Sequence, residues 1–171
     1  MNFEQLKDQF AVLSGVNDCH NGDLYVWFNE AQTDLALAGG MMATADYTVA
    51  GAGEAFALPE GFLQLADCDR AYTLTPDGKI VFASPGQARL YYYRLPKDFS
   101  DAYQGECELA EIWHGLLPIF ATSRFWDRES EGDGEESGHG SKWMKLYNDA
   151  KAKRLKTCGG WQRQLERWIV E

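Results

Sequence analysis

The segment from Glu106 to Glu129, ECELAEIWHGLLPIFATSRFWDRE, is the longest apolar run in the chain and constrains the fold more than any other feature. Its apolar residues recur at helical spacing and form two stripes. The first stripe is Leu109, Ile112, Trp113, Leu116 and Phe120, and the second is Ala110, Leu117, Ala121 and Phe125. A helix that is apolar on two sides must be covered on both, so this segment predicts the centre of a helical core. Pro118 lacks a backbone donor, which predicts a bend or break near Gly115 and two helices that meet at an angle.

Amphipathic helices are predicted on both sides of this segment. The N-terminal part predicts a helical pair, a short helix that ends at Gly15 and a second one that begins near Asn21 or Asp23 and ends at Gly39. Their buried stripes are Phe3, Leu6, Phe10 and Leu13 in the first helix and Leu24, Trp27, Phe28, Ala31, Leu35 and Ala38 in the second. Ser141 to Lys156 predicts a further helix, antiparallel to the central one. Its inward residues are Trp143, Leu146, Tyr147 and Ala150.

Residues 43–95 carry short β-favouring runs that are separated by glycine and proline. The expected strands are Ala43 to Val49, Glu54 to Leu58, Leu63 to Cys68, Ala71 to Leu74, Lys79 to Phe82 and Ala88 to Tyr93. Asp77-Gly78 favours a tight hairpin turn with positive φ. Tyr91, Tyr92 and Tyr93 follow one another on the last strand, so one or two of them face outward unless the strand is buried on both faces.

These patterns predict an α+β fold with N-terminal helices, a small antiparallel β region at about residues 43–95 and a C-terminal antiparallel helical pair. The alternative is a mostly α bundle with a β-hairpin insertion. At 171 residues the chain suits one domain, which we expect to span 1–157. Thr157 to Gly160 predicts a break, so 158–171 is expected to be a hinge and a short tail.

Charge is both strongly negative and unevenly distributed. The net charge of −10 argues against direct binding to a nucleic-acid backbone. Residues 1–40 hold one basic residue against six acidic ones, whereas 141–171 hold eight basic against three acidic. Ends of opposite charge suggest association with ordered partners or between copies of the chain, although any single lysine fits a solvated helix face equally well. No apolar stretch reaches the length of a membrane span and no signal pattern opens the chain, so we expect a protein made in the cytosol.

The search for reactive chemistry finds no constellation. The histidines His20, His114 and His139 lie in three different segments, and the four cysteines form no CxxC pair. Cys107 and His114 are seven positions apart on one predicted helix, too far to act as a nucleophile and its base. The acidic loop at Asp127 begins like a calcium site but has glycine where a bidentate glutamate is needed. We therefore expect no enzyme, no cofactor and no metal, with a small cytosolic enzyme or binding domain built around Cys107 or His114 as the competing class.

The order of the segments resembles a known family. The helix LYVWFNEAQTDLALAGG is followed by AFALPEGFLQLADC, in which Leu58 to Leu65 reads Leu-Pro-x-x-Phe-Leu-x-Leu, and by the hairpin DGKIVFASP. A Tyr-Tyr-x-x-Pro motif, Tyr92 to Pro96, then ends the strand region, and a long helix and WMKLYNDAKAKRLK follow. Over residues 20 to 157 the chain is similar to the head-to-tail adaptor, or head-completion, proteins of tailed bacteriophages. It departs from their common pattern in the acidic loop from Ser130 to Gly140 and in its tryptophan-bearing tail.

The resemblance implies a structural protein of the virion neck. Such a protein forms a ring of about twelve copies beneath the portal, extends the DNA channel and seats the tail. Its partners would be the portal protein, tail or neck proteins and further copies of itself, while genomic DNA passes without sequence-specific binding. The alternative within the same virion is a tail-tube protein or another neck protein.

Two surfaces are candidates for these contacts. The tail is predicted to dock on the portal through an apolar side behind the Gly159-Gly160 hinge, or else to fold back on its own core. The docking residues are Trp161, Leu165, Trp168 and Ile169. The interface between subunits is predicted to use a lysine stripe together with outward tyrosines. Its residues are Lys142, Lys145, Lys153, Lys156, Tyr91 and Tyr93.

Overall fold

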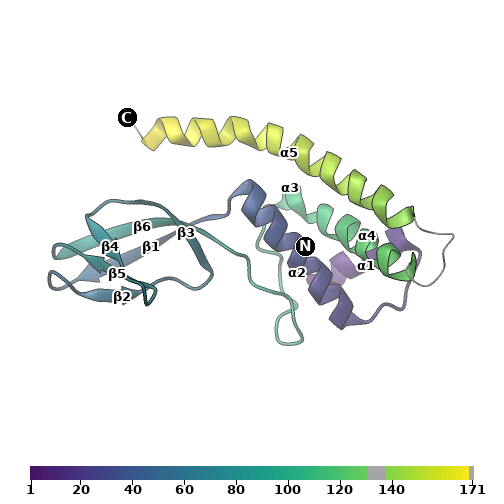
Figure 1. The fold of residues 1–171 in the computed structure, drawn as a ribbon, viewed down its shortest axis with the longest axis horizontal. Helices are drawn as coiled ribbons and strands as arrows, with labels where there is room; N and C mark the ends of the chain where they lie inside the picture. The colour runs from purple at the N-terminus through teal and green to yellow at the C-terminus, as the bar shows by residue number, and fades with distance from the viewer. Residues whose placement is uncertain (131–137, 170–171) are drawn as a thin grey trace. The chain divides into compact units, whose positions relative to one another are not determined.

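The computed structural model describes residues 1–130 and 138–169, with side chains described as far as Thr157. The chain divides into two compact units, a helical unit made of Met1–Gly39 and Pro96–Glu171 and a β unit made of Gly40–Leu95 (Figure 1). Helices at both ends of the chain and strands in its middle confirm the predicted α+β class. One functional domain over 1–157 stays a prediction. The acidic loop falls largely on 131–137, outside the described residues.

The helical pair at the N-terminus forms as predicted. Helix α1 (Phe3–Ser14) begins with a capping box, because the Asn2 side chain accepts the Gln5 N–H at 3.0 Å and the Gln5 side chain accepts the Asn2 N–H at 3.0 Å. It ends at Gly15, whose φ of 74° only glycine adopts at little cost. Helix α2 (Asn21–Gly39) follows. Its stripe differs at the end, where Ala38 is exposed and Ala36 is buried instead.

The central apolar segment forms two helices, as Pro118 predicted. Helix α3 (Glu111–His114) and helix α4 (Leu116–Ser130) meet at Gly115. Pro118 lies in the first turn of α4, where a missing N–H leaves no intrahelical bond unmade.

The prediction of helix for residues 106–110 is wrong. These residues run extended beside the start of the chain, where the Cys107 N–H donates to the Met1 carbonyl at 2.8 Å. Backbone pairing with Met1 and Asn2 replaces the helical hydrogen bonds that the pattern predicted. Ala110 and Ile112, which the apolar stripes placed inside, are exposed.

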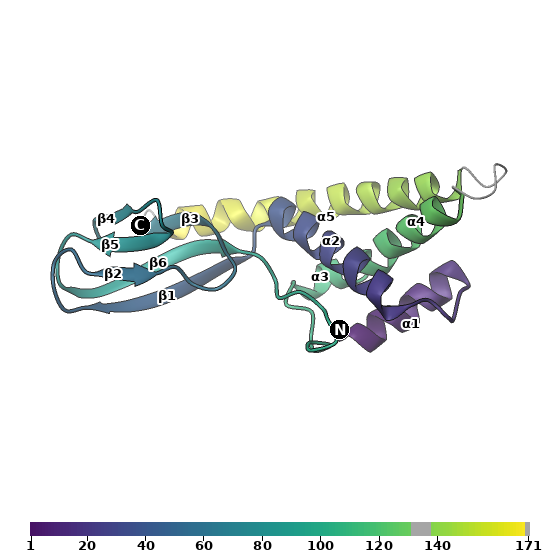
Figure 2. The same cartoon turned by 60° about the horizontal axis from the view of Figure 1, so that its bottom comes forward.

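Helix α5 (His139–Ile169) runs antiparallel to α4 and packs along it (Figure 2). The predicted break at Thr157 to Gly160 is absent, since the helix continues through these residues. Two interior glycines cost a helix about 2 kcal/mol. The long charged and amide residues on both sides of them favour helix, and adding residues to an existing helix is cooperative.

The inward face of α5 differs from the prediction at one residue. Tyr147 is 1% exposed, as expected, but Leu146 is 48% exposed. Arg154 and Leu155 are half-buried further along the helix.

The β unit contains all six predicted strands. They are β1 (Met42–Val49), β2 (Ala55–Ala57), β3 (Phe62–Cys68), β4 (Tyr72–Leu74), β5 (Lys79–Phe82) and β6 (Gly86–Arg94). They form two antiparallel three-stranded sheets, ordered β1-β6-β3 and β2-β5-β4. A shared apolar core of Val49, Ile80, Phe82, Ala88, Leu90 and Tyr92 fills this unit.

Two local predictions in the β unit are confirmed. Gly78 has φ 75° in the hairpin turn, where the Thr75 N–H donates to the Lys79 carbonyl at 2.9 Å. On β6, Tyr92 is buried, whereas Tyr91 and Tyr93 on the opposite face are half-exposed. Alternation along the strand therefore leaves two tyrosines accessible. No helix in the described part of the chain is long and apolar enough to cross a membrane.

Candidate functional site

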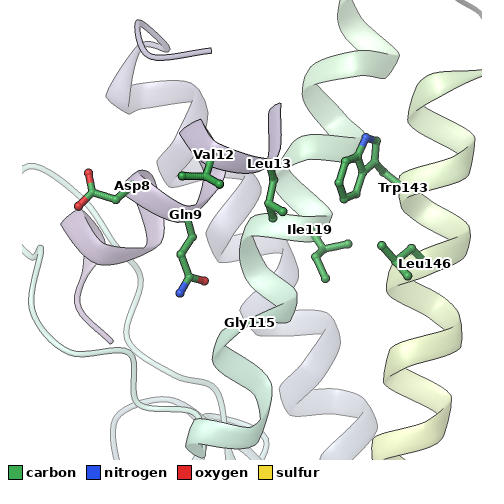
Figure 3. A pocket seen from close by; sticks show the side chains of 8 residues that line it. All are labelled: Asp8, Gln9, Val12, Leu13, Gly115, Ile119, Trp143 and Leu146. Atoms are coloured by element: carbon green, nitrogen blue, oxygen red, sulfur yellow. The ribbon is translucent and has the colours of Figure 1, made fainter. Parts of the chain in front are cut away.

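An apolar groove of about 390 Å³ lies on the helical unit between α1, α4 and α5 (Figure 3). Three segments that are far apart in the sequence supply its walls. The lining residues are Asp8, Gln9, Val12, Leu13, Gly115, Ile119, Trp143 and Leu146. The side chains of Leu13, Ile119 and Leu146 converge in Figure 3, with the Trp143 indole beside them.

The groove is apolar although the core does not need its residues. Helix α1 buries Phe3, Leu6 and Phe10, whereas Val12 and Leu13 near its end are not buried. Val12 is 83% exposed and Leu13 is 36% exposed. Large aliphatic side chains grouped in a concave surface are typical of a protein-binding site.

A partly buried polar cluster holds α5 against α2. Tyr147 Oη donates to Asp34 Oδ2 at 2.5 Å, and Lys151 Nζ donates to the same oxygen at 2.7 Å. Burial, followed by the Asp34 carboxylate, raises the pKa of Tyr147 far above its ordinary value, so the phenol stays a donor. The helix that carries Trp143 and Leu146 is therefore fixed in place.

Ion pairs join α2 to α4 in the same way. Arg124 Nε lies 3.2 Å from Glu30, and Arg128 Nη1 lies 2.8 Å from Asp23. The Arg128 guanidinium also lies over the Trp27 ring, 5.0 Å from its centroid. Three of the six N-terminal carboxylates, Asp23, Glu30 and Asp34, thus pair within the chain.

The predicted subunit interface would pair the basic helix with carboxylates of the N-terminal part, and some of these carboxylates are already paired within the chain. The other three carboxylates in this part of the chain, Glu4, Asp8 and Asp18, are exposed and form no ion pair with a described residue. The predicted lysines are all exposed on α5, and within the described residues they form no ion pair. Tyr91 and Tyr93 lie on β6, in the other unit. The lysines therefore belong to the helical unit and the tyrosines to the β unit, and their shared role in an interface between subunits stays a prediction.

The predicted portal-docking residues lie on the C-terminal part of α5. The backbone of Trp161, Leu165, Trp168 and Ile169 is helical, and their side chains lie outside the described residues. Their role in docking stays a prediction.

Cys107 and His114, the centre of the competing enzyme hypothesis, each serve the core. Cys107 Sγ donates to Gln32 Oε1 at 3.5 Å, and burial raises the pKa of this thiol. His114 Nδ1 lies 2.9 Å from the Met1 nitrogen, and Nε2 lies 2.7 Å from the Leu109 carbonyl oxygen. A protonated thiol and an imidazole with separate partners do not form a nucleophile and its base. Among the described side chains, no group of three potential metal ligands comes together.

The groove does not follow from the apolar pattern of the sequence. Leu13 and Leu146 fit the apolar period, which predicts a place in the core, and both line the groove instead. Val12 is the residue that could have indicated the groove. It is apolar but lies off the helical spacing of Phe3, Leu6 and Phe10, which face the core. Ile119 offered no comparable signal, since it lies inside the longest apolar run.

Only the comparison with solved structures finds matches to this chain. No protein-family model matches this chain, and a search of the curated proteins finds no match. Among solved structures, one match is the neck of an empty GTA particle computed with C6 symmetry, with a TM-score of 0.30 and 12% sequence identity. The match covers 72% of this chain and 76% of that one. A TM-score this low does not establish a common fold.

Proposed function

We propose that this chain is a structural protein of a tailed-phage neck, a head-to-tail adaptor. About twelve copies would form a ring under the portal, extend the DNA channel and seat the tail. The role is not enzymatic: it depends on surfaces that meet other proteins. The alternative place in the same virion is a tail-tube or other neck position.

The observation that carries the proposal is the apolar groove on a fixed helical frame. Val12 and Leu146 hold aliphatic surface in water. Covering one such side chain gains about 1.5–3 kcal/mol, which an isolated monomer forgoes. The Tyr147–Asp34 bond and two ion pairs tie α5 and α4, two of the three helices that line the groove, to α2. The groove is therefore largely preformed before a partner binds.

The two motifs behind the family resemblance support the proposal from the β unit. Leu58 to Leu65 leads into β3, and Tyr92 to Pro96 ends β6. The Leu95 N–H donates to the Gly61 carbonyl at 2.9 Å, so the two motifs lie side by side. Both motifs lie at the end of the β3–β6 ladder where Phe62 pairs with Arg94.

Charge supports the same role. A channel that conducts DNA must not hold phosphate, and a protein with net charge −10 repels it.

The test is co-purification with the portal protein encoded in the same genome. The two proteins are co-expressed, the portal carries the affinity tag, and the eluate is analysed by mass photometry. The proposal predicts that the chain elutes with the portal in a multiple-copy complex. A portal that elutes without the chain, while the chain is folded in the flow-through, contradicts it. Recovery on a tagged tail-tube protein instead would favour the alternative position.

A further inference from the structure

The apolar groove is exposed, and the sequence of the C-terminal part of α5 contains an apolar stripe. Helix α4 has 15 residues and α5 has 31. At 1.5 Å per residue they are about 22 Å and 46 Å long, so roughly half of α5 extends beyond its partner helix. In that half, Trp161, Leu165, Trp168 and Ile169 recur at the spacing of one helical side.

The groove and this segment cannot meet within one chain. Leu146 lines the groove, and Leu165 lies 19 residues further along the same continuous helix. A helix of that length holds the two about 28 Å apart. A hinge at Gly159-Gly160 would let the segment fold back onto its own chain. The helix runs through both glycines, so this fold-back does not occur.

Charges around the groove define what kind of segment fits. Asp8 lies in its wall and is exposed. At the Gly115 end, the Arg154 guanidinium lies beside the backbone, and its buried Nη1 has no hydrogen-bond partner among the described residues. An occupant with an apolar side and charges of both signs suits this groove. The segment WQRQLERWIVE, residues 161–171, has that composition.

We infer that the groove of one copy binds residues 158–169 of α5 from a second copy. Each copy then offers one groove and one helical segment, so the contact is head-to-tail and repeats from copy to copy. Such a contact builds a ring when the rotation closes. The inference names the contact between copies that the proposed function requires. The contact itself does not depend on that function, but the conclusion that it builds a ring does.

A peptide titration tests the contact directly. A fluorescein-labelled synthetic peptide of residues 159–171 is titrated with the full chain and followed by fluorescence anisotropy. We expect saturable binding that Val12→Asp weakens at least about tenfold, because a carboxylate enters an apolar groove. Val26→Asp is the matched control, since Val26 is exposed on α2 outside the groove. Absent saturation, or equal affinity for the two variants, overturns the inference.

Cross-linking shows whether the contact joins two copies. Leu13 is replaced by the photo-reactive benzoylphenylalanine in an equal mixture of ¹⁴N and ¹⁵N chains. Cross-links from position 13 to peptides of 158–169 are expected in mixed-isotope pairs. Cross-links confined to a single chain, or directed to other segments, contradict the inference.

The two proposals fail separately. If the labelled peptide binds the portal and not this chain, the inference is wrong and the neck role stands. If the peptide binds the groove but the portal never retains the chain, the contact between copies stands and the neck role is wrong.

Discussion

Tyr147 on α5 donates a hydrogen bond to Asp34 on α2 over 2.5 Å, although the two residues are 113 positions apart. This bond joins the N-terminal and C-terminal segments of the helical unit. It fixes the helix that supplies Trp143 and Leu146 to the groove.

Removal of this bond should destabilise the helical unit. Tyr147→Phe keeps the ring and deletes the hydroxyl, so Asp34 loses one of its two donors. A hydrogen bond to a carboxylate contributes about 2 kcal/mol, and urea denaturation should show a loss of about that size. Tyr72→Phe on β4 is the control, because Tyr72 is 39% exposed. Equal stability of the two variants would mean that the bond contributes nothing measurable.

Replacing glycine by alanine should have opposite effects on stability inside α5 and at the end of α1. Gly159→Ala and Gly160→Ala replace glycine inside a helix and should each increase its stability by about 1 kcal/mol, with more ellipticity at 222 nm. Gly15→Ala should instead destabilise α1 by roughly 1 kcal/mol, since its φ of 74° suits only glycine. A hinge at 159–160 would give no gain in helix signal.

Asp77 should titrate at unusually low pH. Lys79 donates to its carboxylate at 2.7 Å, and this bond, followed by one from Thr75, lowers the pKa of Asp77 to about 2. Because the folded-state pKa lies below the ordinary one, the pair supports the hairpin above the ordinary aspartate pKa. That support is lost as the pH falls through about 2. Carboxyl-detected NMR titration should show the low pKa in the native chain and a rise toward the ordinary value in Lys79→Met. Lys97→Met, on the helical unit, should leave it unchanged.

The thiol of Cys107 should be unreactive in the folded protein. It is 6% exposed, and burial raises its pKa, as it does for Cys19. In a Cys158→Ser background, iodoacetamide at neutral pH should label Cys68 first and the two buried thiols only as fast as the protein unfolds. Mass spectrometry of the digested protein measures each rate. Rapid labelling of Cys107 in the native state would reveal a thiolate and restore the enzyme hypothesis.

Much of the fold could be predicted from local patterns. All six strands, including the hairpin at Gly78, follow from alternation and turn residues, which act over a few positions. The break at Gly115 follows from Pro118 for the same reason. The extended backbone of residues 106–110 could not be predicted from local patterns. Its hydrogen-bond partners are Met1 and Asn2, which lie about 100 positions earlier in the sequence.

The groove could not be predicted from the apolar period of the helices. An apolar period shows which side of a helix avoids water, but it does not show whether the same chain covers that side. Leu13 and Leu146 fit the period and remain exposed because they line the groove between α1, α4 and α5 instead of packing in the core. The division into a helical and a β unit does not follow from local patterns either, since the helical unit joins distant segments of the chain.

The proposed function is that of a ring-forming protein at a phage portal. Cryo-electron microscopy of the portal protein purified with the native chain measures this most directly. The account predicts a closed ring of this chain against the portal, with the 158–169 helix of each copy in the groove lined by Val12 and Leu146 of its neighbour. Bare portal particles, in the presence of excess folded chain, would contradict it.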